Sequence, residues 1–281
     1  MTIVMRPPRE KVRRMASGQQ AASSGPVTTE RLAAGLRELG VEPGSTVMVH
    51  TSLKSLGWVV GGAQAVLEAL WEAVGPEGTL VMPTQFWQLC DPAVLNEAPS
   101  EWWPVIRENL PLYDPWVTPS QTMGAVAELF RTTPGAIRSA HPQRSIAAAG
   151  PHAAQITVRH PLDAPAGEES PLGALVELDA QILLLGVTAA KATILHLAEH
   201  RADYPGKRNV PNGVAMLVDG RREWVSYEEL DVHDHDFVDV VEAFAADTGL
   251  VRTGPVGDAA ARLLPARALV GYASDWFSAH R

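Results

Sequence analysis

The chain has 281 residues, the size of one large α/β domain or of two small ones, and its 46% apolar and 20% charged residues are typical of a globular protein. This composition excludes wholesale disorder, collagen and coiled coil. The formal net charge of −9 argues against nucleic acid and anionic membranes as partners and favours a cationic ligand.

Residues 1–26 are predicted to form a disordered tail that is not a secretory leader. They contain a Pro7-Pro8 pair, five basic side chains and a stretch rich in Gln, Ala and Ser. No apolar segment of the length of a leader follows the basic side chains. The lone cysteine, Cys90, excludes a disulfide framework and suits a reducing compartment, so we expect a cytoplasmic protein.

The segment after the tail alternates helices with short apolar strands. Leucines at helical spacing over residues 28–39 indicate a helix that Gly40 ends, and a second helix begins at Gly61-Gly62. Residues 46–50 and 79–82 are expected to be buried strands. This order of strand, helix and strand implies parallel strands joined by right-handed crossovers.

Residues 84–118 have no clean period and contain four of the eight tryptophans of the chain, together with five prolines and five acidic residues. Long irregular segments inside a compact domain are usually functional loops or disordered ones, and the tryptophan content argues against disorder. We therefore expect an ordered insertion, which either covers the core or closes over a site as a lid.

The second half of the chain contains a nearly all-apolar strand at residues 181–187, the pattern of a central parallel strand buried on both faces. No apolar run exceeds strand length, so no transmembrane helix is expected. A β-hairpin with a type I′ turn is expected at residues 214–225. Helices are expected at 123–130, 191–202, 237–246 and 266–277. We predict one α/β domain over residues 27–281, with a mainly parallel central sheet flanked by helices, a β-hairpin and a Trp-rich insertion.

The segment His196-Leu-Ala-Glu199-His200 lies on the helix predicted after the central strand. Because positions i and i+3 share a helix face, Glu199 neighbours His196 and can raise its basicity. Such helices begin at the sheet edge where α/β sites form, which makes His196 a candidate general base. The same segment matches the inverted zinc motif H-x-x-E-H, in which His196 and His200 bind zinc and Glu199 is the base. That interpretation also needs a third zinc ligand downstream, and the sequence shows no evident one.

Two polar segments are candidates for binding an anion. Ser52-Leu-Lys-Ser55 follows the first strand, and the free N–H groups of the helix that begins at Gly61-Gly62 suit a phosphate. The second segment is His141-Pro-Gln-Arg-Ser145. No P-loop, no dinucleotide-binding glycine motif and no G-x-S-x-G elbow occurs in the sequence.

Several motifs occur in a fixed order: VHTSLKSLG at 49–57, GGA at 61–63, GTLVMPT at 78–84, DP at 114 and TP at 118, HPxxS at 141–145, LLGV at 184–187 and HLAE at 196–199. Together they resemble the aminoglycoside 3-N-acetyltransferases, the antibiotic acetyltransferase family that is distinct from the common N-acetyltransferase fold. The resemblance implies transfer of an acetyl group from acetyl-CoA to the 3-amino group of the 2-deoxystreptamine ring of aminoglycosides. It also implies antibiotic resistance and chemistry without a metal.

The resemblance further implies roles for individual residues in a ternary complex. His196 is the general base, and Glu199 either orients it or grips the antibiotic. Asp203 and Asp114 are expected as further acidic contacts for the cationic substrate. A homodimer is compatible with the resemblance. The residues expected to hold acetyl-CoA are Ser52, Leu53, Lys54, Ser55, Val60, Gly61 and Gly62, with His141 and Ser145 near its phosphates.

The chain departs from the family at Gln85-Phe86-Trp87, where many relatives carry a tyrosine after the preceding Pro-Thr. Either Tyr113 takes the part of that tyrosine or no residue does. Three other functions remain open: a CoA-dependent N-acyltransferase for a different amine, a zinc hydrolase that uses His196, Glu199 and His200, and a catalytically idle binder of the antibiotic or of CoA.

Overall fold

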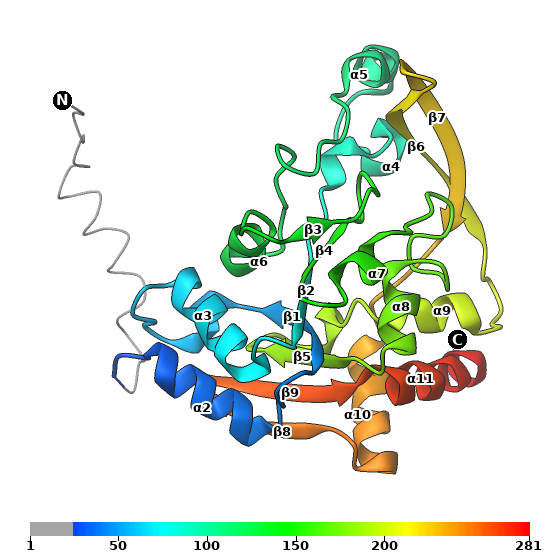
Figure 1. Cartoon of the computed structure of the whole chain (residues 1–281). Coiled ribbons are helices and arrows are strands. Elements are labelled where there is room, and N and C mark those ends of the chain that lie inside the picture. Colours follow the sequence, from blue (N-terminus) through cyan, green and yellow to red (C-terminus); the bar gives the residue numbers. More distant parts are fainter. Residues whose placement is uncertain (1–24) are drawn as a thin grey trace, which may run out of the picture.

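The computed structural model describes residues 25–281, so the predicted tail lies almost wholly outside the described part of the chain. A seven-stranded sheet in the order β3-β4-β2-β1-β5-β9-β8 forms the centre of the domain (Figure 1). The strands are β1 (Thr46–Thr51), β2 (Thr79–Pro83), β3 (Ile137–Arg138), β4 (Ile146–Ala149), β5 (Gln181–Leu185), β8 (Arg252–Val256) and β9 (Ala259–Pro265).

The prediction of a mainly parallel sheet is wrong. Only β1 pairs in parallel with its neighbours β2 and β5, whereas β4, β3, β9 and β8 join by antiparallel pairs. The strand–helix–strand order is therefore correct for the central three strands and does not extend to either side of them. Gly254 and Pro255 interrupt the apolar pattern of β8, which lies at the edge of the sheet, where proline is tolerated.

Successive side chains of the central strands enter two separate cores, because strand side chains alternate between the faces of a sheet. Val47 and Val49 pack on one face with α2, α3 and α6. Met48 packs on the other face with the remaining large helices. The helices are α2 (Thr29–Leu39), α3 (Ala63–Val74), α6 (Ala125–Arg131), α7 (Ala153–Thr157), α8 (Pro171–Glu177), α9 (Leu195–Arg201), α10 (Phe237–Thr248) and α11 (Ala266–His280).

Helix boundaries follow local capping chemistry. Thr28 accepts the N–H of Arg31 at the start of α2, and Gly40 ends that helix in the left-handed conformation, as predicted. The helix predicted over residues 191–202 begins later, at Leu195, since a 3-10 turn (Ala189–Lys191) and an irregular Ala192 precede it. His196 consequently lies in the first turn of α9.

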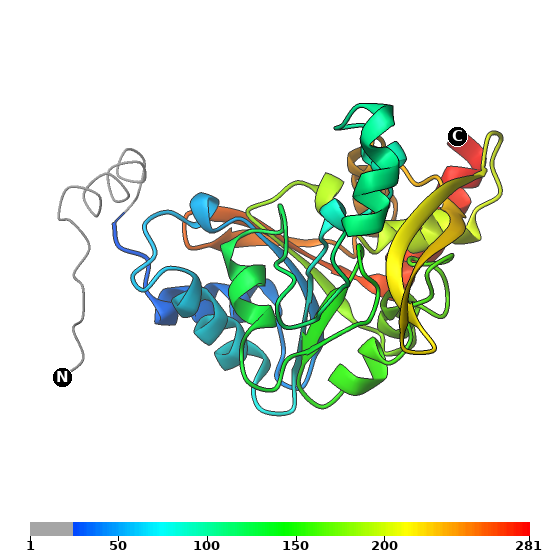
Figure 2. The ribbon, with the colours of Figure 1, turned by 90° about the horizontal axis from the view of Figure 1, so that it is seen from above.

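The Trp-rich insertion is ordered and packs against the hairpin (Figure 2). It contains 3-10 turns at Trp87–Leu89 and Ser100–Trp102 and the short helices α4 (Pro92–Leu95) and α5 (Trp103–Asn109). Arg222 of the hairpin donates to the carbonyls of Arg107 and Leu110. The hairpin itself comprises β6 (Asn209–Val218) and β7 (Arg221–Leu230).

The turn of the hairpin has the predicted type. Asp219 and Gly220 have φ of 48° and 77°, and two successive positive φ angles are what a type I′ turn requires. Among residues 25–281, no helix is both long and apolar enough to cross a membrane.

Candidate active site

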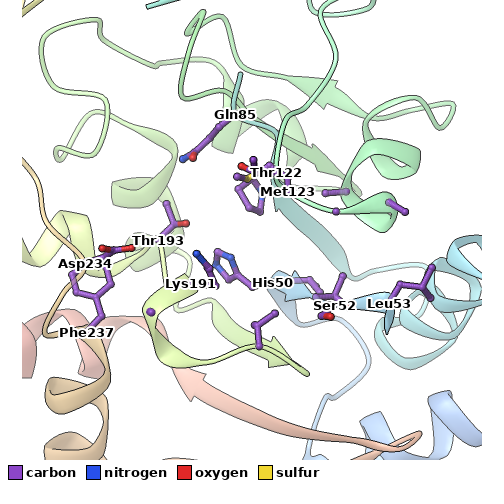
Figure 3. Close-up of a pocket in the computed structure, with 18 of the residues that line it drawn as sticks. His50, Ser52, Leu53, Gln85, Thr122, Met123, Lys191, Thr193, Asp234 and Phe237 are labelled. Atoms are coloured by element: carbon purple, nitrogen blue, oxygen red, sulfur yellow. The ribbon is translucent and has the colours of Figure 1, made fainter. Parts of the chain in front are cut away.

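A cavity of about 610 Å³ opens where the three parallel strands end. Its lining includes the segment 49–54 at the end of β1, Pro83 and Gln85 at the end of β2, and Val187 in the loop after β5. Sites of open α/β sheets form at the carboxyl ends of parallel strands, so the two parallel pairs are enough to create this position. Figure 3 shows Ser52 and Leu53 at one end of the cavity and Asp234 and Phe237 at the other.

His196 lies on the wall of this cavity and is joined to Glu199 behind it. The Nδ1 atom of His196 lies 2.5 Å from Oε2 of Glu199. The imidazole side chain is 19% exposed and the carboxylate is fully buried. Because Glu199 engages Nδ1, the nitrogen left for the cavity is Nε2. The ring of Phe237, 4.9 Å away between centroids, packs against the imidazole and holds its plane.

The Glu199 carboxylate is kept ionised by its partners. Burial alone raises its pKa, but hydrogen bonds from His196, from the N–H of His233 and from Arg281 outweigh burial and leave the pKa below its usual value. A buried carboxylate that accepts from Nδ1–H fixes the tautomer of the histidine and stabilises its protonated form. The pair can therefore take a proton from a group in the cavity.

The prediction that Glu199 grips the substrate is wrong, because the carboxylate has no exposed surface. Neither Asp203 nor Asp114 lines the cavity. Asp203 follows the end of α9, and its N–H donates to Ser278. Asp114 accepts the N–H groups of Trp116 and Val117 in a local turn.

The predicted acetyl-CoA residues divide into two groups. Ser52, Leu53 and Lys54 line the cavity. Ser55 does not, and its hydroxyl donates to Oγ of Ser52. The turn formed by Val60, Gly61 and Gly62 also lies outside the cavity lining.

His141 and Ser145 are not anion contacts, since both are buried away from the cavity. Nδ1 of His141 accepts the N–H groups of Gln143 and Arg144, which organises the loop before β4. The hydroxyl of Ser145 donates to the carbonyl of Thr84. Within that predicted segment, Arg144 alone lines the cavity, where it pairs with Glu229 at 2.9 Å.

Tyr113 does not take the part of the missing family tyrosine. Its hydroxyl donates to the carbonyl of Ser139 at 2.8 Å, and the side chain does not line the cavity. At the corresponding wall, Gln85 and Trp87 face the cavity instead.

The structure adds cavity residues to which the sequence assigned no role. His50 is the last residue but one of β1, and its Nε2 atom is buried with no hydrogen-bond partner among the described residues. Burial and the nearby Lys191 ammonium lower the pKa of His50 to about 3, so its imidazole is neutral at physiological pH. Thr193, Lys191 and Asp234 also line the cavity (Figure 3). For Asp234, the acidic run Asp231–Asp236 was the available signal.

The part of the chain that the structure describes does not support the hypothesis of a zinc hydrolase. Within residues 25–281, no group of three or more His, Cys, Asp or Glu side chains is arranged to hold a metal ion. Glu199 is occupied by His196 and Arg281 and is not free to activate water. Burial and the Lys207 ammonium lower the pKa of His200 to about 4, and this residue does not line the cavity.

A mixed α/β sheet with a polar cavity at the ends of its parallel strands is the framework of an α/β enzyme. The profile of the aminoglycoside 3-N-acetyltransferase family matches residues 48–278. The chain belongs to this family of acyltransferases.

Named relatives agree with this assignment. The chain is 41% identical over 255 residues to an SPbeta prophage-derived aminoglycoside N(3')-acetyltransferase-like protein of Bacillus subtilis, covering 90% of this chain and 93% of the relative. It is 39% identical to aminoglycoside N(3)-acetyltransferase VII of Streptomyces paromomycinus, covering 90% and 92%.

Solved structures share the same fold. The crystal structure of the Bacillus subtilis protein YokD superposes with a TM-score of 0.88 at 40% identity and covers 92% of this chain and 96% of that one. AAC-IIIb in a binary complex with CoASH gives 0.80 at 34%, covering 90% and 96%. AAC-VIa bound to sisomicin gives 0.80 at 32%, covering 92% and 99%.

Proposed function

We propose that this protein transfers the acetyl group of acetyl-CoA to the 3-amino group of the 2-deoxystreptamine ring of aminoglycosides and so confers resistance to them. The observation that carries the proposal is the His196–Glu199 pair, placed on a cavity at the ends of the parallel strands. Family membership supports the reaction class. The lone buried cysteine, Cys90, supports a cytoplasmic location.

Two protons must leave the amine nitrogen in this reaction. An aminoglycoside amine is largely protonated, and an ammonium has no lone pair with which to attack a thioester, so it first loses one proton to solvent. The free amine then forms a bond to the thioester carbonyl carbon, and Nε2 of His196 takes the second proton from the amine nitrogen. The carbon–sulfur bond breaks, and the imidazolium gives this proton to the departing thiolate. The products are the amide, the CoA thiol and one proton released to solvent.

The two ends of the cavity differ in a way that fits two substrates. Ser52 and Leu53 lie at one end, and the next residue in the chain, Lys54, also lines the cavity. These side chains offer hydroxyl, apolar and cationic groups to the pantetheine arm and a phosphate of CoA. The relative AAC-IIIb was solved with CoASH. Asp234 lies at the other end beside Phe237, the residue whose ring packs against His196, and offers a carboxylate to a cationic acceptor. The relative AAC-VIa was solved with sisomicin.

The test is mass spectrometry of kanamycin-class and gentamicin-class compounds after incubation with acetyl-CoA. We expect a product heavier by one acetyl group, with fragments that place it on the 3-amino nitrogen, together with release of the CoA thiol. Acetylation at another nitrogen would contradict the regiochemistry. Antibiotic binding without thiol release would identify a binder and not a transferase.

A second candidate is an N-acyltransferase for a less cationic amine, and the charges of the cavity favour it. Lys54 and Lys191 both line the cavity, and neither forms an ion pair with a described residue. Arg144 also lines it, and among the lining side chains the opposing carboxylate is Asp234. Two unpaired ammonium groups disfavour a substrate with several positive charges.

Substituting Lys191 distinguishes these acceptors. With Lys191→Gln, we expect the KM of a polycationic aminoglycoside to fall about three- to tenfold at low salt, because one repulsion of about 1 kcal/mol is removed. The difference should shrink as salt is raised. Steady-state kinetics at two ionic strengths provide the measurement.

The matched control is Arg159→Gln, which removes the same charge at an exposed ion pair with Glu169. Arg159→Gln should leave the KM of the aminoglycoside and the KM of acetyl-CoA unchanged. If Lys191→Gln instead raised the KM of acetyl-CoA alone, the lysine would belong to the donor end of the cavity.

A further inference from the structure

Arg281 lies directly behind the His196–Glu199 pair and joins it to a second carboxylate. Its Nη1 atom lies 2.5 Å from Oε1 of Glu199, the oxygen that His196 does not use. Its Nε and Nη2 atoms each lie 2.7 Å from an oxygen of Asp236. Nη2 also donates to the carbonyl of His233. The guanidinium is therefore bound along both of its edges.

This arrangement is closed to solvent. The side chain of Arg281 is 8% exposed, that of Asp236 10%, and Glu199 is fully buried. The guanidinium carbon lies 3.9 Å from the ring centroid of Phe277 and 5.2 Å from that of Tyr204, so aromatic faces cover it. Charges held away from water interact strongly, and the loss of one partner leaves the others uncompensated.

We propose that Arg281 is a positioning residue of the transfer reaction: it keeps Glu199 ionised and fixes its orientation, so that His196 presents Nε2 to the amine. This inference rests on the proposed function. Arg281 touches no substrate, since it does not line the cavity.

The charges of the cluster explain how Arg281, placed between two carboxylates, supports proton uptake by His196. Glu199 and Asp236 carry two negative charges and Arg281 one positive charge. With a neutral imidazole the cluster therefore has a net charge of −1, and when His196 takes the proton the cluster becomes neutral. Proton uptake is favoured at this step because it removes an unbalanced buried charge.

Other titratable or charged groups face this cluster from every side. They are His200 of α9, Tyr204 and Lys207 of the segment after it, Asp231, His233, Asp234 and His235 of the segment before α10, and Arg144 and Lys191 of the cavity lining. None of these groups contacts both carboxylates in the described structure. The balance between Glu199 and Asp236 thus depends on Arg281.

The first test is the pH dependence of kcat for Arg281→Gln. Without the guanidinium, either Glu199 takes up a proton or the two carboxylates raise the proton affinity of His196. Both outcomes reduce the active form at low pH, so the acidic limb of the profile should move up by about one pH unit or more. At pH 7 we expect kcat to fall about 10- to 100-fold, with the KM of acetyl-CoA unchanged.

Two further variants separate positioning from a general loss of structure. Arg281→Lys keeps the charge, so the acidic limb should stay near its wild-type position even if kcat is lower. Asp236→Asn removes the second carboxylate and should move the limb in the opposite direction, to lower pH. Arg262→Gln, which breaks an exposed pair with Glu242, is the control and should leave the profile unchanged.

An NMR measurement that needs no turnover tests the role of Arg281 separately from the proposed function. The Nδ1–H proton of His196 should give a downfield NMR signal, assigned by its absence in His196→Ala. Arg281→Gln should change this signal: it is lost or moves upfield if Glu199 takes up a proton, and it moves further downfield if the imidazole does. If wild type acetylates while Arg281→Gln keeps both the signal and the wild-type pH profile, the positioning role is overturned. If wild type does not acetylate but the signal responds, the proposed function alone fails.

Discussion

Replacing His196 with alanine is expected to lower kcat about 10²- to 10⁴-fold, the usual contribution of a positioned general base. The imidazole is the group on the cavity wall whose Nδ1 is engaged by a buried, ionised carboxylate. The variant should bind acetyl-CoA as wild type does, because the donor end at Ser52–Lys54 is unchanged. Steady-state kinetics with thiol release provide the measurement.

His196→Ala also leaves one oxygen of Glu199 without a partner, which costs about 1–3 kcal/mol of stability. His196→Asn avoids much of this cost, since its amide can donate to Glu199 yet accepts no proton near neutral pH. We expect the two variants to be equally slow while their melting temperatures differ. His200→Ala, one turn along the same helix, is the control and should turn over like wild type. Normal turnover by His196→Asn would show that another group is the base.

Local chemistry made parts of this fold predictable. The α2 boundaries follow from Thr28 and Gly40, and the hairpin turn follows from Asp219-Gly220. The sheet was predictable only where strands and helices alternate, from β1 to β2 and at β5. The antiparallel strands on either side of the central three were not predictable, because β4 has four small or aliphatic residues and β8 contains Gly254 and Pro255. Their strand character depends on pairing with neighbours that are distant in sequence.

The site was predictable to the extent that its chemistry is local. His196 and Glu199 are three residues apart on one helix, so their contact follows from helix geometry. Arg281 reaches the same carboxylate from 82 positions away, which no spacing rule indicates. The burial of His141 and Glu199 was equally hard to predict. Their residue types suited ligand contacts, but the fold encloses both side chains. Exposure is a tertiary property, and it decided which polar residues were available to a substrate.

The free energy of unfolding is expected to fall steeply as the pH drops below about 6.5. Burial lowers the pKa of His50 to about 3, of His160 to about 4, and of His141 well below its usual value. In the unfolded chain these imidazoles titrate near 6.5. Between the two values the unfolded chain binds protons that the folded chain does not. Their contribution to stability is therefore complete above pH 6.5 and is lost as the pH falls toward 4 for His160 and toward 3 for His50.

The two most buried imidazoles, His50 and His141, should together account for about 3 kcal/mol per pH unit in that range, since one proton corresponds to about 1.4 kcal/mol per unit. Glu128, whose pKa hydrogen bonds from Arg131 and Ser120 hold near 2 against the effect of burial, loses its contribution only below about pH 4.5. Urea unfolding between pH 5 and 7.5 thus isolates the histidines. His50→Gln should reduce the slope by about one proton, whereas His280→Gln, at an exposed position, should not. A flat stability profile between pH 5 and 6.5 would mean that these imidazoles can be protonated within the folded protein.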